Sequence, residues 1–173
     1  MTPPDFPAGE YVPEPTPTAA RRAELIAEIA GLPAKVRAIV SGLSDAQLDT
    51  PYKKWTARQI VHHLADSHVN AFVRFRLTLT EDRPTIKPYD ETRWAELADT
   101  KSADIGLSLA LLDALHARWV YLMRAMTDAD WGRTYHHPEY RKTFALAEVL
   151  GLYAHHGRHH AGQVEWLRQA KGW

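Results

Sequence analysis

The chain has 173 residues, 45% of them hydrophobic, and its 21 basic side chains balance its 21 acidic ones. This length predicts one domain with a well-buried core, and the absence of net charge argues against a general nucleic-acid-binding protein. Because the sequence contains no cysteine, disulfides and thiolate ligands are excluded. Any metal would have to be held by histidine, carboxylate or water.

The N-terminal region, residues 1–18, contains six prolines, and we predict that it lies extended over a domain formed by residues 19–173. It lacks the basic region followed by an apolar run that marks a secretory signal. No stretch of the chain approaches the length of a membrane span. We therefore expect a cytoplasmic protein without a membrane partner.

Helical periodicity then divides the chain into long and short helices. Thr18 is a candidate N-cap for a helix that ends at Gly31, and Pro33 is suited to open a second piece that ends near Leu43. The other predicted helices are three long ones, at 56–80, 104–126 and 144–169, and three short ones, at 44–48, 90–97 and 127–131. Residues 135–142 are predicted to form a loop or a small extended excursion.

Four long helical segments are separated by one long connection, residues 82–103, which is otherwise predicted to be loop. Almost no stretch shows the alternating pattern of a strand. These features predict an all-α protein, a four-helix bundle with a long crossover and short extra helices.

The last predicted helix contains four histidines within six residues, as two pairs with i, i+4 spacing. His155 and His159 share the polar side of this helix and are predicted to face solvent, whereas His156, His160 and Gln163 lie along its apolar stripe. The inward pair is therefore predicted to be His156 and His160. Such a pair is half of a metal site, or else a core pair hydrogen-bonded to the backbone or to Gln163, and a third ligand would decide between these interpretations.

The second long helix offers three histidines as the third ligand. His62 falls opposite the apolar stripe and is predicted to be exposed, whereas His68 lies nearer the centre of the stripe and is better explained as a core histidine. His63 lies at the edge of the stripe, at the start of a polar row that indicates a pocket. That row continues through Ser67, Asn70 and Arg74. We therefore select His63 as the third ligand.

Three histidines from two helices are typical of catalytic zinc, which keeps a fourth position for water or substrate. A structural zinc would more often be closed by a fourth ligand, commonly cysteine. Imidazole ligands suit zinc, nickel, iron or copper, and the sequence does not choose among them. The remaining histidines of the central and C-terminal regions, His116, His136 and His137, are assigned to structure or surface.

Two segments carry a resemblance to a known family. Residues 55–70, WTARQIVHHLADSHVN, resemble the first histidine motif of DinB-like proteins of the YfiT subgroup. Residues 156–160, HGRHH, resemble the second motif of that family, His-x-x-x-His. Further similarity lies in residues 43–52, 79–91 and 115–119, so that the resemblance covers most of the chain.

The resemblance implies a four-helix bundle in an up-down-down-up arrangement, often dimeric, with a divalent metal held by His63, His156 and His160. Of the candidate metals, we expect zinc or nickel, one ion per chain. The subgroup is described as metal-dependent hydrolases, and relatives in the wider family are S-transferases that activate a low-molecular-weight thiol. One departure is the short loop between Tyr52 and Trp55, so substrate preference is not carried over.

Three functional interpretations follow. In the first, the protein is a metal-dependent enzyme that acts on a small molecule, as a hydrolase or a thiol S-transferase, and Asn70 and Arg74 line its substrate pocket. The catalytic residues are unknown, because neither Asp66 nor Tyr153 is a convincing general base. This gap keeps open a second interpretation, a non-catalytic metal- or ligand-binding bundle. In the third, the histidines are hydrogen-bonded core residues of an interaction protein.

A homodimer is also predicted, from aromatic residues outside the expected core. Trp94 in the crossover and Trp173 at the C-terminus would mark a subunit contact if they are exposed. The alternative is that both pack onto their own chain.

Overall fold

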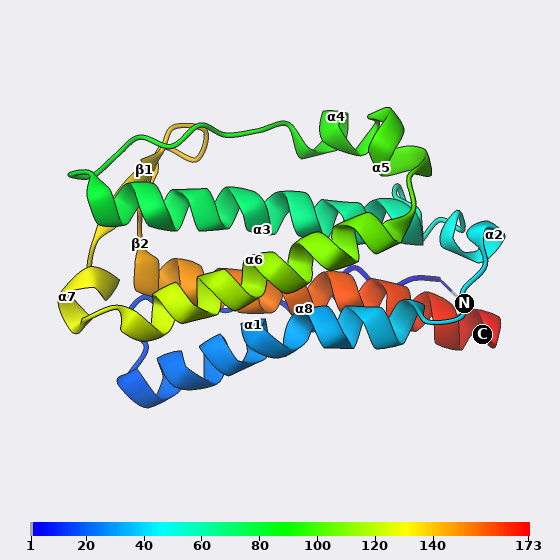
Figure 1. Cartoon of the computed structure of the whole chain (residues 1–173), viewed down its shortest axis with the longest axis horizontal. Coiled ribbons are helices and arrows are strands. Elements are labelled where there is room, and N and C mark those ends of the chain that lie inside the picture. The colour runs from blue at the N-terminus through cyan, green and yellow to red at the C-terminus, as the bar shows by residue number, and fades with distance from the viewer. Residues whose placement is uncertain (1) are drawn as a thin grey trace.

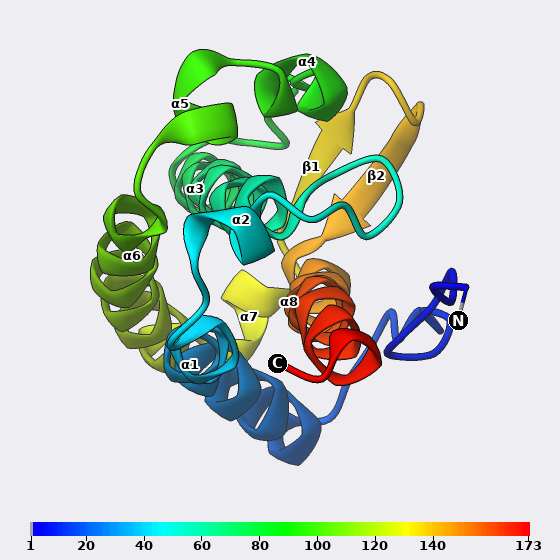
Figure 2. The same cartoon turned by 90° about the vertical axis from the view of Figure 1, so that its right-hand side faces the viewer.

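Four long helices form the molecule, as the computed structural model in Figure 1 shows for residues 2–173. They are α1 (Ala19–Val40), α3 (Ala57–Thr80), α6 (Ile105–Ala125) and α8 (Leu146–Lys171). Helices α1 and α8 run in one direction and α3 and α6 in the other, which confirms the up-down-down-up bundle. Helices α1 and α3 each pack against both α6 and α8, so the four surround a common core (Figure 2).

Short elements connect the long helices. They are α2 (Asp45–Leu48), α4 (Glu91–Ala95), α5 (Ala98–Ser102), α7 (Asp128–Trp131), β1 (Thr134–His137) and β2 (Lys142–Ala145). Because α3 and α6 are parallel, the crossover between them returns along the whole bundle and carries α4 and α5 (Figure 1). The short helix predicted at 90–97 is α4, whereas α5 lies at residues 98–102, where loop was predicted.

The segment predicted as a loop or extended excursion is an antiparallel hairpin of β1 and β2. The crossover joins it, because the Ile86 amide donates to the His136 carbonyl (3.0 Å) and the His136 amide donates to the Pro84 carbonyl (2.9 Å). The pairing of β2 continues to Ala145, so α8 begins at Leu146, two residues later than predicted. The hairpin therefore lies beside the start of α8.

Helix α1 is continuous, and the predicted break before Pro33 is wrong. The Thr18 side chain caps its start by accepting from the Arg21 amide (3.2 Å), as predicted. Pro33 lies inside the helix, where it has no N–H to donate to the carbonyl of Ile29 four residues earlier. That carbonyl is therefore available to another donor.

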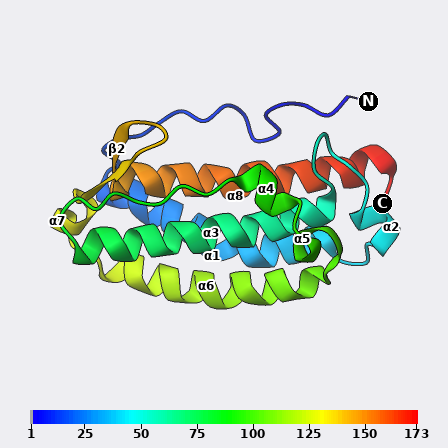
Figure 3. The same cartoon turned by 90° about the horizontal axis from the view of Figure 1, so that it is seen from above.

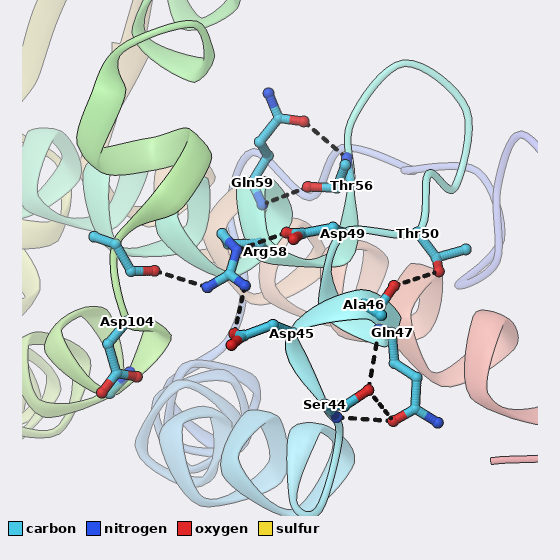
Figure 4. Close-up of polar contacts among 12 residues, drawn as sticks. Ser44, Asp45, Ala46, Gln47, Asp49, Thr50, Thr56, Arg58, Gln59 and Asp104 are labelled. Carbon is cyan, nitrogen blue, oxygen red and sulfur yellow. Dashed lines mark hydrogen bonds and ion pairs between the residues drawn. The ribbon is translucent and has the colours of Figure 1, made fainter.

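One end of the bundle is held by Arg58, which is only 4% exposed. Its Nε donates to Asp49 (2.7 Å), its Nη2 to Asp45 (2.7 Å) and its Nη1 to the Ala103 carbonyl (2.9 Å). Figure 4 shows this arginine beside the capping boxes that begin α2 and α3. The cluster ties α2, α3 and the start of α6 together.

The apolar core consists of two parts, one toward each end of the bundle. One part includes Leu25, Ile29, Phe75, Trp119 and Leu150. The other includes Leu32, Leu64, Leu112, Ala161 and Leu167. Along each long helix the two sets are separated by a short interval, and in α3, α6 and α8 that interval contains inward-facing histidines. A polar layer of imidazoles therefore crosses the middle of the bundle.

The proline-rich N-terminal segment runs along α8, as Figure 3 shows. The Tyr52 hydroxyl donates to the Pro4 carbonyl (2.6 Å), and the Tyr11 hydroxyl donates to the Glu148 carbonyl (3.4 Å). A Cβ at Gly162 would lie 3.3 Å from the Pro7 Cβ, so a glycine in α8 gives this segment room.

Helix α6 is long and apolar enough to cross a membrane, by length and composition alone. This corrects the expectation that no stretch approaches that length. Only 33% of its most apolar window is buried, and Leu107, Leu111 and Tyr121 are exposed. A single helix of this kind is weak support for a membrane span, since helices inside bundles pass the same test, and α6 packs against α1 and α3.

Candidate metal centre

The structure brings together the three histidines selected from the sequence. One ring nitrogen each of His63, His156 and His160 lies within 4.8 Å of the others. The Nε2 atoms of His63 and His156 are 3.2 Å apart. Two nitrogens bound to one tetrahedral zinc, at 2.0–2.1 Å each, would be about 3.3–3.4 Å apart. The spacing therefore fits a common ion.

The backbone of α8 explains why this pair of histidines faces inward. The i, i+4 spacing aligns His156 and His160 along one face, and Gly157 between them faces α1. A Cβ at Gly157 would lie 2.5 Å from Leu32 Cδ2, so any larger residue would require the Leu32 side chain to move. The close approach of α8 to α1 fixes the rotation of α8 about its axis.

A series of hydrogen bonds leads from His156 away from the cluster. His156 Nδ1 lies 3.3 Å from His68 Nε2, and His68 Nδ1 lies 2.9 Å from His116 Nε2. His116 Nδ1 lies 2.7 Å from the Ile29 carbonyl oxygen. His68 and His116 are both buried, which agrees with the assignment of His68 as a core histidine and places His116, assigned to structure or surface, in the structure.

A second hydrogen bond orients His160. Its Nδ1 lies 2.8 Å from Gln163 Oε1, which can only accept, so that Nδ1 carries the proton and Nε2 is left unprotonated. The Gln163 amide nitrogen in turn lies 3.1 Å from His159 Nε2. The Trp55 ring covers His63, at 4.5 Å between ring centroids. The helical period places Gln163 along the inward stripe, whereas the sequence indicates Trp55 only as part of a motif.

The electrostatics favour neutral rings in the cluster. Burial lowers the pKa of His63 to about 4. Burial, followed by the neighbouring imidazoles, lowers the pKa values of His156 and His160 well below the usual range. Neutral imidazole is the form that binds a metal ion. The three residues therefore fit a divalent ion with nitrogen ligands, such as zinc or nickel.

Two predictions of exposure are wrong. His62 is buried, with Nδ1 2.7 Å from the Ser108 hydroxyl and Nε2 3.3 Å from the Ala103 carbonyl, because α6 and the end of the crossover cover this side of α3. His155 is also buried, because Tyr11 of the N-terminal segment packs over its ring at 5.3 Å between centroids. The periodicity of a single helix cannot report such covering segments.

A cavity of about 650 Å³ adjoins the cluster, with His156 in its wall. Helix α3 contributes Ser67 and Arg74, α8 contributes Tyr153, and the crossover and hairpin contribute the other side. Residues from those two segments include Tyr89, Asp90, Glu91, Tyr135, His137 and Glu139. This volume is within the range of small-molecule sites.

The two predicted pocket residues differ in position. Arg74 lines the cavity, where its Nη1 donates to the Tyr153 hydroxyl (3.3 Å) and its buried Nε has no hydrogen-bond partner among residues 2–173. Asn70 is not among the lining residues, and its amide donates to the Asp66 carbonyl one turn earlier (2.8 Å). The polar row therefore predicted Arg74 better than Asn70.

Acidic residues near the centre have perturbed pKa values. Burial, and then the charge of Asp99, raises the pKa of Asp66 to about 6, although Asp66 neither joins the cluster nor lines the cavity. In the cavity, burial, followed by Glu139 and Asp90, raises the pKa of Glu91. Sequence reasoning missed Glu91 because it lies in the crossover, and only its place in the residue 79–91 motif could have indicated it.

The fold and the cluster together define a class of protein: a four-helix bundle with a three-histidine centre, suited to a divalent ion, at the wall of a small-molecule cavity. The comparisons with known proteins agree with this class. A model of the DinB superfamily matches residues 28–164, and the chain belongs to this superfamily.

Named relatives cover nearly the whole chain. The chain is 45% identical to "Putative metal-dependent hydrolase YfiT" of Bacillus subtilis, over 97% of this chain and 96% of the relative. It is 50% identical to a protein of the same description from Geobacillus kaustophilus, over 87% and 85% of the two chains. The solved structure of B. subtilis YfiT, described as a probable metal-dependent hydrolase with an unusual four-helix bundle topology, matches with a TM-score of 0.95 over 97% of each chain.

Proposed function

We propose that this protein is a metal-dependent hydrolase in which His63, His156 and His160 hold one divalent ion, zinc or nickel. The 3.2 Å spacing of two Nε2 atoms carries the proposal, because it is close to the edge of a tetrahedral coordination shell. The names of the relatives support hydrolysis. Bound by three imidazoles, such an ion supplies Lewis acidity and lowers the pKa of a water ligand.

The cavity beside His156 is the proposed substrate site. Arg74 lines the cavity, and its guanidinium carries the positive charge that would attract an anionic group of the substrate. Burial raises the pKa of Tyr153, which keeps its hydroxyl protonated and able to donate to the same group. We therefore infer that Arg74 orients a negatively charged part of the substrate.

Carboxylates near the cavity mouth restrict the charge of that substrate. Asp90, Glu91 and Glu139 lie on the side formed by the crossover and the hairpin. Their combined negative charge would repel a multiply charged anion more than a singly charged one. A small ester or amide with one carboxylate is the substrate class that fits this arrangement.

Metal analysis followed by activity assays tests the proposal. Protein purified without a histidine tag is expected to contain about one zinc or nickel ion per chain. The loaded protein should hydrolyse members of an ester and amide panel faster than His156→Ala. Turnover only with a thiol plus an electrophile would identify an S-transferase instead. Bound metal without turnover in either panel would favour a binding protein, and no bound metal would overturn the metal centre.

The predicted homodimer is a separate proposal. Trp94 is 38% exposed, with its ring 4.5 Å from that of Tyr89 between centroids. Trp173 is partly buried against its own chain, where its carbonyl accepts from Arg168 Nε (3.2 Å). Only Trp94 therefore supports a subunit contact. Sedimentation of the wild type, with Trp94→Lys as the comparison, would test it. The cytoplasmic location stays a prediction.

A further inference from the structure

Two histidines that are not in the metal cluster connect it to the main chain of α1. The connection runs from His156 through His68 and His116 to the Ile29 carbonyl, with nitrogen–nitrogen distances of 3.3 and 2.9 Å and a final nitrogen–oxygen distance of 2.7 Å. This series of hydrogen bonds connects all four long helices: α8, α3, α6 and α1. Its three histidines lie in the polar layer between the two apolar parts of the core.

The carbonyl at the end of the series determines where every proton lies. A carbonyl oxygen can only accept, so His116 carries its proton on Nδ1 and accepts on Nε2. His68 must then donate from Nδ1 and accept on Nε2. His156 in turn donates from Nδ1, which leaves its Nε2 unprotonated. That atom is the one that lies 3.2 Å from His63 Nε2.

Pro33 explains why a helical carbonyl is free for this purpose. In an α-helix the carbonyl of residue i normally accepts from the N–H of residue i+4. Pro33 is that residue for Ile29, and it has no N–H. The His116 ring therefore supplies the missing donor.

We propose that His68 and His116 are positioning residues for the metal centre. They hold the His156 ring in the tautomer and orientation that present Nε2 to the ion, so the centre is organised before an ion arrives. Partners that fix the second nitrogen of a ligand histidine typically change metal affinity by 10–100-fold. The inference rests on the proposed metal centre, but the tautomers can be measured without any metal.

The alternative is that these rings only fill the polar layer of the core. His62 provides a matched control, because it is also a buried histidine between α3 and α6 with both ring nitrogens hydrogen-bonded. The hydrogen bonds of His62 lead to Ser108 and Ala103 and not to the cluster. If the role of His116 is only structural, phenylalanine at either position should have similar effects on metal binding.

The experiment compares zinc affinity in His116→Phe, His116→Gln and His62→Phe, measured by competition with a chromophoric chelator. We expect His116→Phe to bind zinc 10–100-fold more weakly. His116→Gln should regain most of the affinity, because its amide supplies one donor and one acceptor, and His62→Phe should remain within about threefold of wild type. Equal affinities in all the variants, or equal losses in His62→Phe and His116→Phe, would overturn the proposal.

A second measurement covers the case in which His116→Phe does not fold. Nitrogen-15 spectra of histidine side chains in metal-free wild type should report His68, His116 and His156 as neutral rings protonated on Nδ1. A proton on Nε2 of His156 would overturn the inference even if zinc binds tightly. Failure of the wild type to bind any metal, with the expected tautomers, would instead overturn the proposed function.

Discussion

Each of two sides of α3 carries an arginine and a histidine, but the two sides differ in how many of these side chains' nitrogens are hydrogen-bonded within the protein. On the side toward α6 and the end of the crossover, Arg58 and His62 have protein partners for every hydrogen-bonding nitrogen that the structure describes. On the side toward α8 and the cavity, Arg74 Nε has no partner among residues 2–173, and His63 Nε2 faces another imidazole nitrogen.

This difference teaches that neither burial nor residue type identifies the functional side. All three of Arg58, His62 and His63 are buried. What differs is whether the protein itself satisfies the polar atoms, because an unsatisfied buried group costs free energy unless a ligand completes it. The side that faces α8 is therefore the one that we propose receives an ion and a substrate.

The largest expected effect comes from removing a ligand on the functional side. His156→Ala should lower zinc affinity at least a thousandfold, which corresponds to about 4 kcal/mol, because it removes one of three ligands and the end of the imidazole series. Competition with a chelator measures the effect. His155→Ala, next to it in α8, should bind zinc like the wild type, and a similar loss in both variants would contradict the assignment.

Acid should destabilise the metal-free protein, because the buried neutral histidines on the α8 side of α3, such as His63, resist protonation in the folded state. The pKa of His63 falls from 6.5 to about 4 on folding, because burial disfavours the charged ring. Between these values the unfolded chain binds more protons, so stability is present above pH 6.5 and is lost as pH falls toward 4. The loss should be on the order of 1 kcal/mol per pH unit for each such histidine.

Urea unfolding at pH 7, 6 and 5 measures this slope. His63→Phe should show a smaller dependence on pH than the wild type, because the titrating ring is gone. A wild-type stability that does not change between pH 7 and pH 5 would contradict the buried neutral cluster.

The two arginines of α3 are expected to differ in how much they contribute to the unfolding free energy. Arg58→Met is expected to lower the unfolding free energy by about 1–2 kcal/mol, through the lost bond to the Ala103 carbonyl and weakened contacts to two largely exposed aspartates. Arg74→Met should change stability by less than about 1 kcal/mol, because the loss of the hydrogen bond to Tyr153 is offset by removal of a buried Nε without a partner among residues 2–173. Chemical denaturation measures both. A greater loss of stability in Arg74→Met than in Arg58→Met would reverse the comparison.

The smallest expected effect concerns α1. Pro33→Ala restores an N–H that competes with His116 for the Ile29 carbonyl, so zinc affinity should fall by about threefold, although removal of a helix-interior proline should raise stability. Gly31→Ala is the control, because a Cβ there meets no atom within 4 Å. It should raise stability without changing affinity. Unchanged affinity in Pro33→Ala would show that the carbonyl serves both donors.

The sequence by itself determined the four-helix bundle and which face of α8 points into it. Apolar residues at a helical period, interrupted by prolines in one long stretch, define four long helices and a crossover. The same period turns His156 and His160 inward, and the polar row that starts at His63 indicated the third member of the cluster. These predictions succeeded because each depends on one helix and its own apolar stripe.

Only the tertiary structure decided what covers the other faces. Periodicity gives the angle of a side chain about its helix axis, but not the segment that packs over that angle. His62 and His155 are therefore buried by the crossover and by the N-terminal segment, where the sequence predicted exposure. For the same reason the link between Pro33 and His116, which lie 83 positions apart in the numbering (116 − 33), became visible only when α1 and α6 were side by side.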